Sequence, residues 1–425
     1  MKPVYRTLIL SLVIMILIVA CDILPIAQTV AAPSVPTATT LPEIQPTELT
    51  SVQTEPVLIW LAPQFDPATM AGQLLTTRLA EFEAQHPGVQ INVRVKPLSG
   101  PGGLLEALDA ATTAAPAVVP DLLTLSPDDI ELAAKSVLLA ALPENLINPE
   151  SPGWYDYALP QIRFEGNFYG MPFASELDIL AYRTDLYPVS PRSWDTLLEE
   201  PRTLLFPAAD PRARFTLAMY LGAGGQLTDE SGQIALDVNI IEQILTLLAS
   251  GRSSSVIPLA VRQYSSPLET WTELKANRTA SAMAPLADFL REGDSEQLAA
   301  TALPTEAGQG IGLASTWSWA MTPSDAARQE ILFELLEWLA DPGFLGAFTH
   351  ALGLLPTSQA TLAAWPEDGD SALVSSLVTI AQPEPYAALR SVVAPALQAA
   401  VEALLGAGQD PAAAAQEAAL FVNNP

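Results

Sequence analysis

The sequence predicts an α/β fold built on a mostly parallel sheet. Val57–Leu61 is a run of apolar residues of the kind that forms a buried strand. Residues 69–85 place leucines and Phe82 at helical spacing, and Gly88 follows the end of this helix. The stretch 89–95 alternates apolar and polar residues, as a strand with one polar face does. Strand, helix, strand in this order is the repeating unit of α/β proteins.

The same pattern continues along the chain. Residues 104–115 are expected to form a second helix, and 118–125 a third strand. Ser126 then begins a helix with acidic residues in its first turn. In such sheets ligands bind beyond the carboxyl ends of the strands, which places residues 60–64 and 125–128 at a possible site.

The stretch 164–187 predicts a hairpin and a change of strand. Gly166-Asn167 lies between Phe164 and Phe168 and is typical of a two-residue hairpin turn. Residues 177–182 form a second apolar run, as a buried strand does. Two strands meeting at 173–176 would create a crossing point where side chains can face a cleft. The alternative is an ordinary core hairpin followed by a strand.

The N-terminus reads as a targeting signal. A short basic region precedes an apolar run, 7–20, which is shorter than the ~20 residues that a spanning helix needs. It ends in Ile18-Val-Ala-Cys21, which resembles a bacterial lipobox with Cys21 as the lipidated residue of the mature protein. An uncleaved membrane-anchoring helix is the alternative. Cys21 is the only cysteine, so once it is acylated no thiol remains for a disulfide, a metal or a nucleophile.

Residues 22–55 and 56–425 differ in composition. The first range is rich in Pro, Thr and Ser, and we expect a disordered tether that holds a folded body away from the membrane. Residues 56–425 are globular in composition and long enough for two lobes. The net charge of −28 argues against nucleic-acid binding.

Short stretches spread over the globular part resemble one protein family. Their order and spacing are similar to those of the extracellular solute-binding proteins of bacterial ABC importers, the family that includes maltose-binding protein. The stretches are 82–93, 120–123, 132–142, 169–173, 180–187, 193–197, 282–283, 319–321, 334–342, 353–356 and 396–405.

The resemblance implies a two-lobed periplasmic-binding-protein-like fold of type II with a hinge. Lobe one would comprise 56–173 and 315–353, and lobe two 177–312 and 357–425. A solute, most simply a carbohydrate, would bind between the lobes and pass to the permease subunits of an ABC transporter. We expect a lipid-anchored monomer on the extracytoplasmic face of the cell membrane, without a cofactor or metal.

Sugar sites combine aromatic faces with polar groups that fix hydroxyls. Trp317 and Trp319 are the sharpest candidates because residues two apart on a strand share a face. The alternative is that both belong to the core. Trp60, at the end of the first strand, is a third candidate. The remaining candidates are Phe173, Glu176 and Asp178 at the crossing, Asp210 and Arg212 by the resemblance, and Tyr386 in the tail.

Two departures from the family leave the solute open. Arg183 stands where the family often has asparagine, and no tryptophan lies near Asp288, where sugar binders carry one.

The sequence offers little for catalysis. The chain has two histidines and no His-Glu-x-x-His, Gly-x-Ser-x-Gly or Ser-x-x-Lys motif. Ser99-Gly-Pro-Gly-Gly103 lacks the ending of a phosphate-binding loop. We therefore expect that this protein is not an enzyme. Paired carboxylates keep a surface glycoside hydrolase open as the competing class, and a solute sensor without transport is a third reading.

Overall fold

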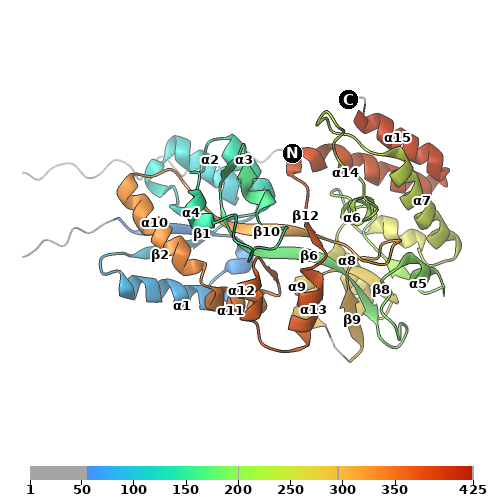
Figure 1. Cartoon of the computed structure of the whole chain (residues 1–425), viewed down its shortest axis with the longest axis horizontal. Helices are drawn as coiled ribbons and strands as arrows, with labels where there is room; N and C mark the ends of the chain where they lie inside the picture. The colour runs from blue at the N-terminus through green and yellow to red at the C-terminus, as the bar shows by residue number, and fades with distance from the viewer. Residues whose placement is uncertain (1–54, 200, 294–295, 424–425) are drawn as a thin grey trace, which may run out of the picture. The chain divides into compact units, whose positions relative to one another are not determined.

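The computed structural model describes residues 55–199, 201–293 and 296–423 (Figure 1). The predicted signal peptide, Cys21 and nearly all of the predicted tether lie outside these residues. The described chain is a mixed α/β protein with one main sheet of strand order β2-β1-β3-β10-β6-β8-β7. The predicted fold class is confirmed.

The N-terminal half of the sheet is parallel. β1 (Val57–Leu61) pairs in parallel with β2 (Ile91–Val95) and β3 (Leu122–Leu125). The helices between and after them are α1 (Met70–Gln85), α2 (Leu104–Ala114) and α3 (Pro127–Lys135). Thr69 and Ser126 cap α1 and α3 with their side chains, as the sequence predicts for Ser126.

Two antiparallel strands carry the sheet from one half of the molecule to the other. β6 (Met171–Arg183) pairs through its first half with β10 (Gly312–Met321). Its second half pairs with β8 (Ser281–Pro285) and β9 (Leu298–Thr301). Figure 1 shows β6 and β10 side by side, running between the two groups of helices.

The remaining elements complete this sheet or pack around it. They are α4 (Glu144–Ile147), β4 (Arg163–Phe164), β5 (Asn167–Phe168), α5 (Trp194–Leu198), β7 (Leu204–Leu205), α6 (Arg214–Gly222), α7 (Val238–Ser253), α8 (Pro267–Lys275), α9 (Leu286–Glu292), α10 (Ala326–Leu339), α11 (Pro342–Leu352), β11 (Leu355–Pro356), α12 (Gln359–Ala363), α13 (Gly369–Leu377), β12 (Ala381–Pro383), α14 (Ala387–Glu402) and α15 (Pro411–Asn423), with short 3₁₀ turns between some of them.

The buried side chains form two separate hydrophobic clusters, which we call the first core and the second core. The first core contains β1, β3 and α1 and extends to Leu354. The second core contains α6, α7 and α14 and begins again at Leu355. The chain passes between the cores at 174–177, 314–317 and 354–355, and Tyr157 and Ala158 also reach the second core. Each core defines one lobe of the two-lobed fold.

Within the part of the chain that the structure describes, one helical stretch, Ala387–Ala407, is long and apolar enough to cross a membrane by length and composition alone. Half of it is buried, and α14 packs against α15 and α6. This burial identifies it as a core helix of the second lobe.

Three local predictions need correction. The hairpin turn is Glu165-Gly166, because a type I′ turn requires positive φ at both central residues and these two have φ of 48° and 86°. The third strand begins at Leu122, because Pro116 opens a 3₁₀ turn and Pro120 has no N–H to donate. The two strands expected to meet at 173–176 are one strand, because β10 and β11 hold those residues extended.

Candidate functional site

A cavity of about 350 Å³ lies between the two cores. Gln64, Leu352 and Leu354 reach it from the first lobe, and β6 and β10 cross its wall. Most of the other lining residues come from the second lobe. The full lining is Gln64, Glu176, Leu177, Asp178, Arg212, Arg214, Ala218, Ser266, Pro267, Leu268, Met283, Pro285, Ala287, Asp288, Arg291, Leu303, Leu313, Ser315, Leu352, Leu354 and Glu384.

The crossing strand places two carboxylates in the cavity. Glu176 and Asp178 are two residues apart on β6, so their side chains leave the strand on the same face. They stand where β6 exchanges β10 for β8 as its partner. The sequence prediction that Glu176 and Asp178 sit at the crossing agrees with this placement, and their contact with a solute stays a prediction.

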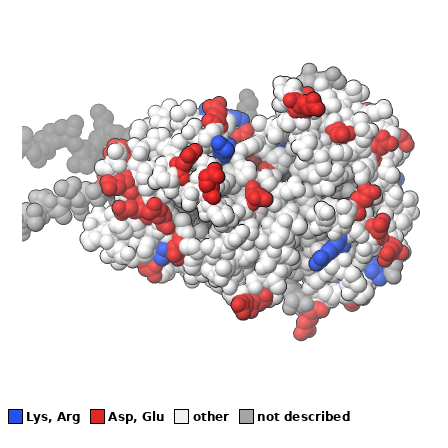
Figure 2. Space-filling view, in the orientation of Figure 1, with Lys and Arg blue, Asp and Glu red and all other residues white. Residues whose placement is uncertain are grey.

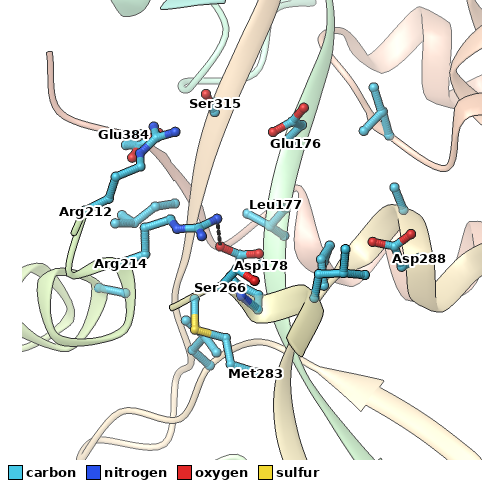
Figure 3. A pocket seen from close by; sticks show the side chains of 18 of the residues that line it. Glu176, Leu177, Asp178, Arg212, Arg214, Ser266, Met283, Asp288, Ser315 and Glu384 are labelled. Atoms are coloured by element: carbon cyan, nitrogen blue, oxygen red, sulfur yellow. Dashed lines mark hydrogen bonds and ion pairs between the residues drawn. The ribbon is translucent and has the colours of Figure 1, made fainter. Parts of the chain in front are cut away.

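Arg214 binds the second of these carboxylates. Its Nη1 lies 3.0 Å from Asp178 Oδ2, and its Nε lies 2.8 Å from Asp210 Oδ2 (Figure 3). Asp210 is only 2% exposed and also accepts from the backbone N–H groups of Arg212 and Arg214. Asp210 therefore lies behind the cavity wall and orients the start of α6.

A second charged group joins the lobes at the cavity edge. Arg212 pairs with Glu384, which follows β12. Arg390 on α14 pairs with Asp128 on α3 and lies 3.4 Å from Glu384. Because α3 belongs to the first lobe and α14 to the second, this chain of charges connects the two. The Nε of Arg212 is buried and has no hydrogen-bond partner among the described residues.

Glu176 stands apart from the arginines (Figure 3). Its side chain is accessible to solvent within the cavity although atoms of both lobes surround it. Its Oε1 accepts a hydrogen bond of 2.9 Å from Nε1 of Trp317. Ser315 is its neighbour across the strand pair and also faces the cavity.

Burial perturbs both carboxyl groups on β6. Desolvation raises the pKa of Asp178 to about 6, against the opposing effect of Arg214, and Asp210 and Glu176 add to the rise. Desolvation also raises the pKa of Glu176, while the hydrogen bond from Trp317 and the more distant charges of Arg212 and Arg214 oppose this rise. Burial therefore makes the ionised form of either carboxyl group less favourable in free energy. A cation or a hydrogen-bond donor in contact with the carboxylate would reduce this cost.

The predicted aromatic residues are placed in the first core. Trp317, Trp319 and Phe173 are 4%, 1% and 1% exposed, and their rings pack around Phe65 and one another. Trp60 is 2% exposed, with the Lys96 ammonium 4.4 Å from its ring centre. The lining contains none of these four. Trp317 approaches the cavity only through its bond to Glu176.

Tyr386 lies outside this cavity, although it begins the same tail helix that carries Arg390. Its hydroxyl donates to the carbonyl oxygens of Pro160 and Arg163. It lines a different depression, with Pro149, Glu150 and Phe168 among its neighbours.

The sequence did not single out Arg214, Glu384, Ser315 or Gln64. Arg214 alone carried a signal, because it continues the Asp210-Pro-Arg212 stretch that the resemblance selected. Gln64 was included only as part of the predicted loop 60–64. Glu384 and Ser315 come from separate segments that the sheet brings together, and neither has a local pattern that marks it.

Among the described residues one histidine-containing group could hold a metal ion. His350, Asp368 and Asp370 place their ligand atoms within 4.8 Å of one another. Asp368 already caps α13 through the backbone N–H of Ser371 and lies 3.5 Å from His350 Nε2. Asp368 is therefore already engaged at the start of α13, beside His350.

Solved structures share this architecture of two lobes joined by crossing strands. The maltose-bound MalE3 of T. maritima matches with a TM-score of 0.64 and 18% identity over 87% of this chain and 99% of that one. MalE of Xanthomonas citri matches with a TM-score of 0.70 and 18% identity over 87% and 96%. The cyclic alpha-maltosyl-1,6-maltose binding protein of Arthrobacter globiformis matches with a TM-score of 0.69 and 17% identity over 87% and 98%.

The sequence itself matches the family described as bacterial extracellular solute-binding protein over residues 69–344. The chain belongs to this family. No curated protein matches it. The family implies an extracytoplasmic location, in agreement with the sequence prediction.

Proposed function

We propose that this protein captures a carbohydrate between its two lobes and delivers it to the permease of an ABC importer. The observation that supports this most directly is the cavity itself. Both lobes contribute to its wall, and polar side chains gather where β6 and β10 cross it. A solute that contacts both lobes favours the conformation in which they are close together.

The solved structures motivate the choice of a carbohydrate. One of these proteins is bound to maltose, and another is a binding protein for cyclic alpha-maltosyl-1,6-maltose. Sugar hydroxyls need both donors and acceptors. The cavity offers Ser266, Ser315 and Gln64 for both roles, with carboxylates as further acceptors.

A thermal-shift screen against mono- and oligosaccharides tests the proposal. A sugar that binds only the folded protein raises the melting temperature, because it adds stability that grows with the logarithm of its concentration relative to Kd, about 2.7 kcal/mol at a hundredfold excess over Kd. Glu402→Gln, an exposed site outside the cavity, is the control, and it should retain the shift. If no sugar shifts the melting temperature, the carbohydrate assignment fails.

Binding without turnover is part of the same proposal. A glycosidase needs one carboxyl group that donates a proton. Asp178 and Glu176 both have a raised pKa, but Arg214 holds Asp178 in an ion pair and the indole of Trp317 donates a hydrogen bond to Glu176. Incubation with aryl glycosides should release no product. Sustained release that Asp178→Asn abolishes would establish the hydrolase instead.

We also propose a lipid anchor at Cys21, with residues 22–55 as the tether to the folded body. The basic region, the apolar run and the cysteine at its end support it. A sensor that binds the same solute without transporting it remains the alternative. Deletion of the gene that encodes this protein should abolish cellular uptake of the bound sugar if the protein serves an importer. Uptake should be unchanged if the protein is a sensor.

A further inference from the structure

The arginines that line the cavity are already paired. Three arginines face it, and each has a carboxylate partner within the described chain. An anionic solute would have to displace one of these carboxylates. The pairs are Arg212 with Glu384, Arg214 with Asp178 and Asp210, and Arg291 with Asp288.

Glu176 is the exception among the carboxylates of the lining. No Lys or Arg of the described residues lies within ion-pair distance of it, and its one side-chain hydrogen bond comes from the neutral indole of Trp317. Figure 3 shows its carboxylate on β6, away from Arg212 and Arg214. The cavity therefore holds one negative charge without a direct counter-charge.

Apart from Gln64, Ser266 and Ser315, the uncharged part of the lining is aliphatic. Leucine, proline, alanine and methionine side chains make up most of it, and none of the lining side chains is aromatic. The C–H face of a sugar ring consequently has no aromatic side chain in this lining on which to stack, so the cavity lacks the large apolar contact that an aromatic ring supplies. Electrostatic pairing is the strongest interaction that these walls can offer.

We propose that the solute carries a positively charged amine that pairs with Glu176. This inference rests on the proposed function and narrows it from a carbohydrate to an amino sugar. The ammonium would lie at the strand crossing, beside the Ser315 hydroxyl, and the rest of the solute would lie against the aliphatic wall.

Two further observations agree with this assignment. Burial disfavours the charged form of Glu176, as its raised pKa indicates, and a cation in contact would reverse that effect. The net charge of −28 also attracts cations at long range, and Figure 2 shows a face on which Asp and Glu far outnumber Lys and Arg.

Matched ligand pairs test the inference by calorimetric titration of the folded protein. The sugar pairs are glucosamine with glucose, and the β-1,4-linked glucosamine dimer with cellobiose. The non-sugar pair is 1,4-diaminobutane with 1,4-butanediol. A charge-assisted hydrogen bond should make an amino sugar bind roughly ten- to a hundredfold more tightly than its neutral counterpart.

Two variants assign the preference to Glu176. Glu176→Gln keeps the shape and the hydrogen bond from Trp317 but removes the charge, and it should abolish the preference for the amine. Glu402→Gln makes the same change of charge outside the cavity and should keep the preference. Circular dichroism confirms that both variants fold.

The outcomes separate this inference from the proposed function. If neutral sugars bind as well as or better than amino sugars, the carbohydrate function stands and the inference is overturned. If only the diamine binds, and Glu176→Gln abolishes its binding, the positive charge is supported while the carbohydrate function fails. A preference that Glu176→Gln retains overturns the role of Glu176. No binding by any member overturns both.

Discussion

The indole Nε1 of Trp317 lies 2.9 Å from Oε1 of Glu176 and donates a hydrogen bond to it. The two residues belong to paired strands, where Trp317 faces Ala174 and Ser315 faces Glu176, so the bond runs diagonally across the pair. The ring is buried in the first core while the carboxylate opens into the cavity. One bond thus fixes a cavity group to the interior of the first lobe.

Substitution of Trp317 should separate packing from positioning. Trp317→Ala leaves a cavity in the first core and should lower the free energy of unfolding by about 3–5 kcal/mol. Trp317→Phe keeps most of the ring but removes the donor. It should cost less stability and still weaken binding, because Glu176 loses its orientation. Urea denaturation and ligand titration of both variants measure the two effects. Unchanged stability of Trp317→Ala would contradict the burial of this ring.

The ionisation of Asp178 should make stability depend on pH. Burial raises its pKa in the folded state to about 6, above the usual 3.8, so the folded state binds a proton more readily than the unfolded state does. Stability therefore falls as pH rises from about 4 to 6 and stays lower above that window. Asp178→Asn resembles the protonated group. Its stability relative to the wild type should increase over the same window, by at most about 3 kcal/mol.

Urea denaturation at pH 4, 5, 6 and 7 tests this dependence. Glu402→Gln serves as the control for a general effect of charge, since Glu402 is exposed and its pKa is lowered by Arg262. A difference between Asp178→Asn and wild type that does not change with pH would refute the prediction.

Two of the three lining arginines, Arg214 and Arg291, should differ in their effect on stability. Arg214 joins Asp178 and the buried Asp210, so Arg214→Ala leaves two carboxylates without their cation and should cost about 3–5 kcal/mol. The pair between Arg291 and Asp288 involves a side chain that is 53% exposed on the arginine side, so Arg291→Ala should cost about 1 kcal/mol or less. Thermal denaturation compares them, and equal losses would contradict the distinction.

The anchor at Cys21 predicts a change of fractionation. Cys21→Ser cannot be acylated, so the variant should leave the membrane fraction or retain its uncleaved signal peptide. The wild-type protein should carry a lipid on Cys21, which mass spectrometry of the membrane fraction detects. An intact Met1 in mature wild-type protein would instead favour the uncleaved helix.

Much of the fold was predictable because its signals are local. The run 57–61, the capped helix after Ser126 and the apolar run 177–182 each depend on neighbours in sequence. The predicted turn lay one residue too far along the chain, at Gly166-Asn167 instead of Glu165-Gly166. The residue types in a turn do not reveal which of them takes positive φ. The continuity of β6 was missed because it depends on pairing with β10 and β11, far along the chain.

The site was only partly predictable. Glu176, Asp178 and Arg212 line the cavity. The first two were predicted because they lie at the expected crossing between lobes, and Arg212 was predicted from the family resemblance. The tryptophans were chosen from residue type, which does not distinguish a binding face from a core. Trp317 and Trp319 lie in the core, where Phe65 packs against Trp317 and Phe173 packs against Trp319. Glu384 could not be found because a segment more than 200 residues after Glu176 brings it to the cavity.

The continuity of β6 also limits how this protein can change length. Its two ends serve different cores, and residues 174–182 pair with β10 and then β8 without a register shift. Inserting a single residue between Ser175 and Leu177 would turn every side chain on one side of the insertion to the opposite face. Either Phe173 or Ile179 would then lose its place in a core. Insertions and deletions in loops can reshape other parts of the cavity rim. The crossing strand accepts substitutions but not insertions or deletions.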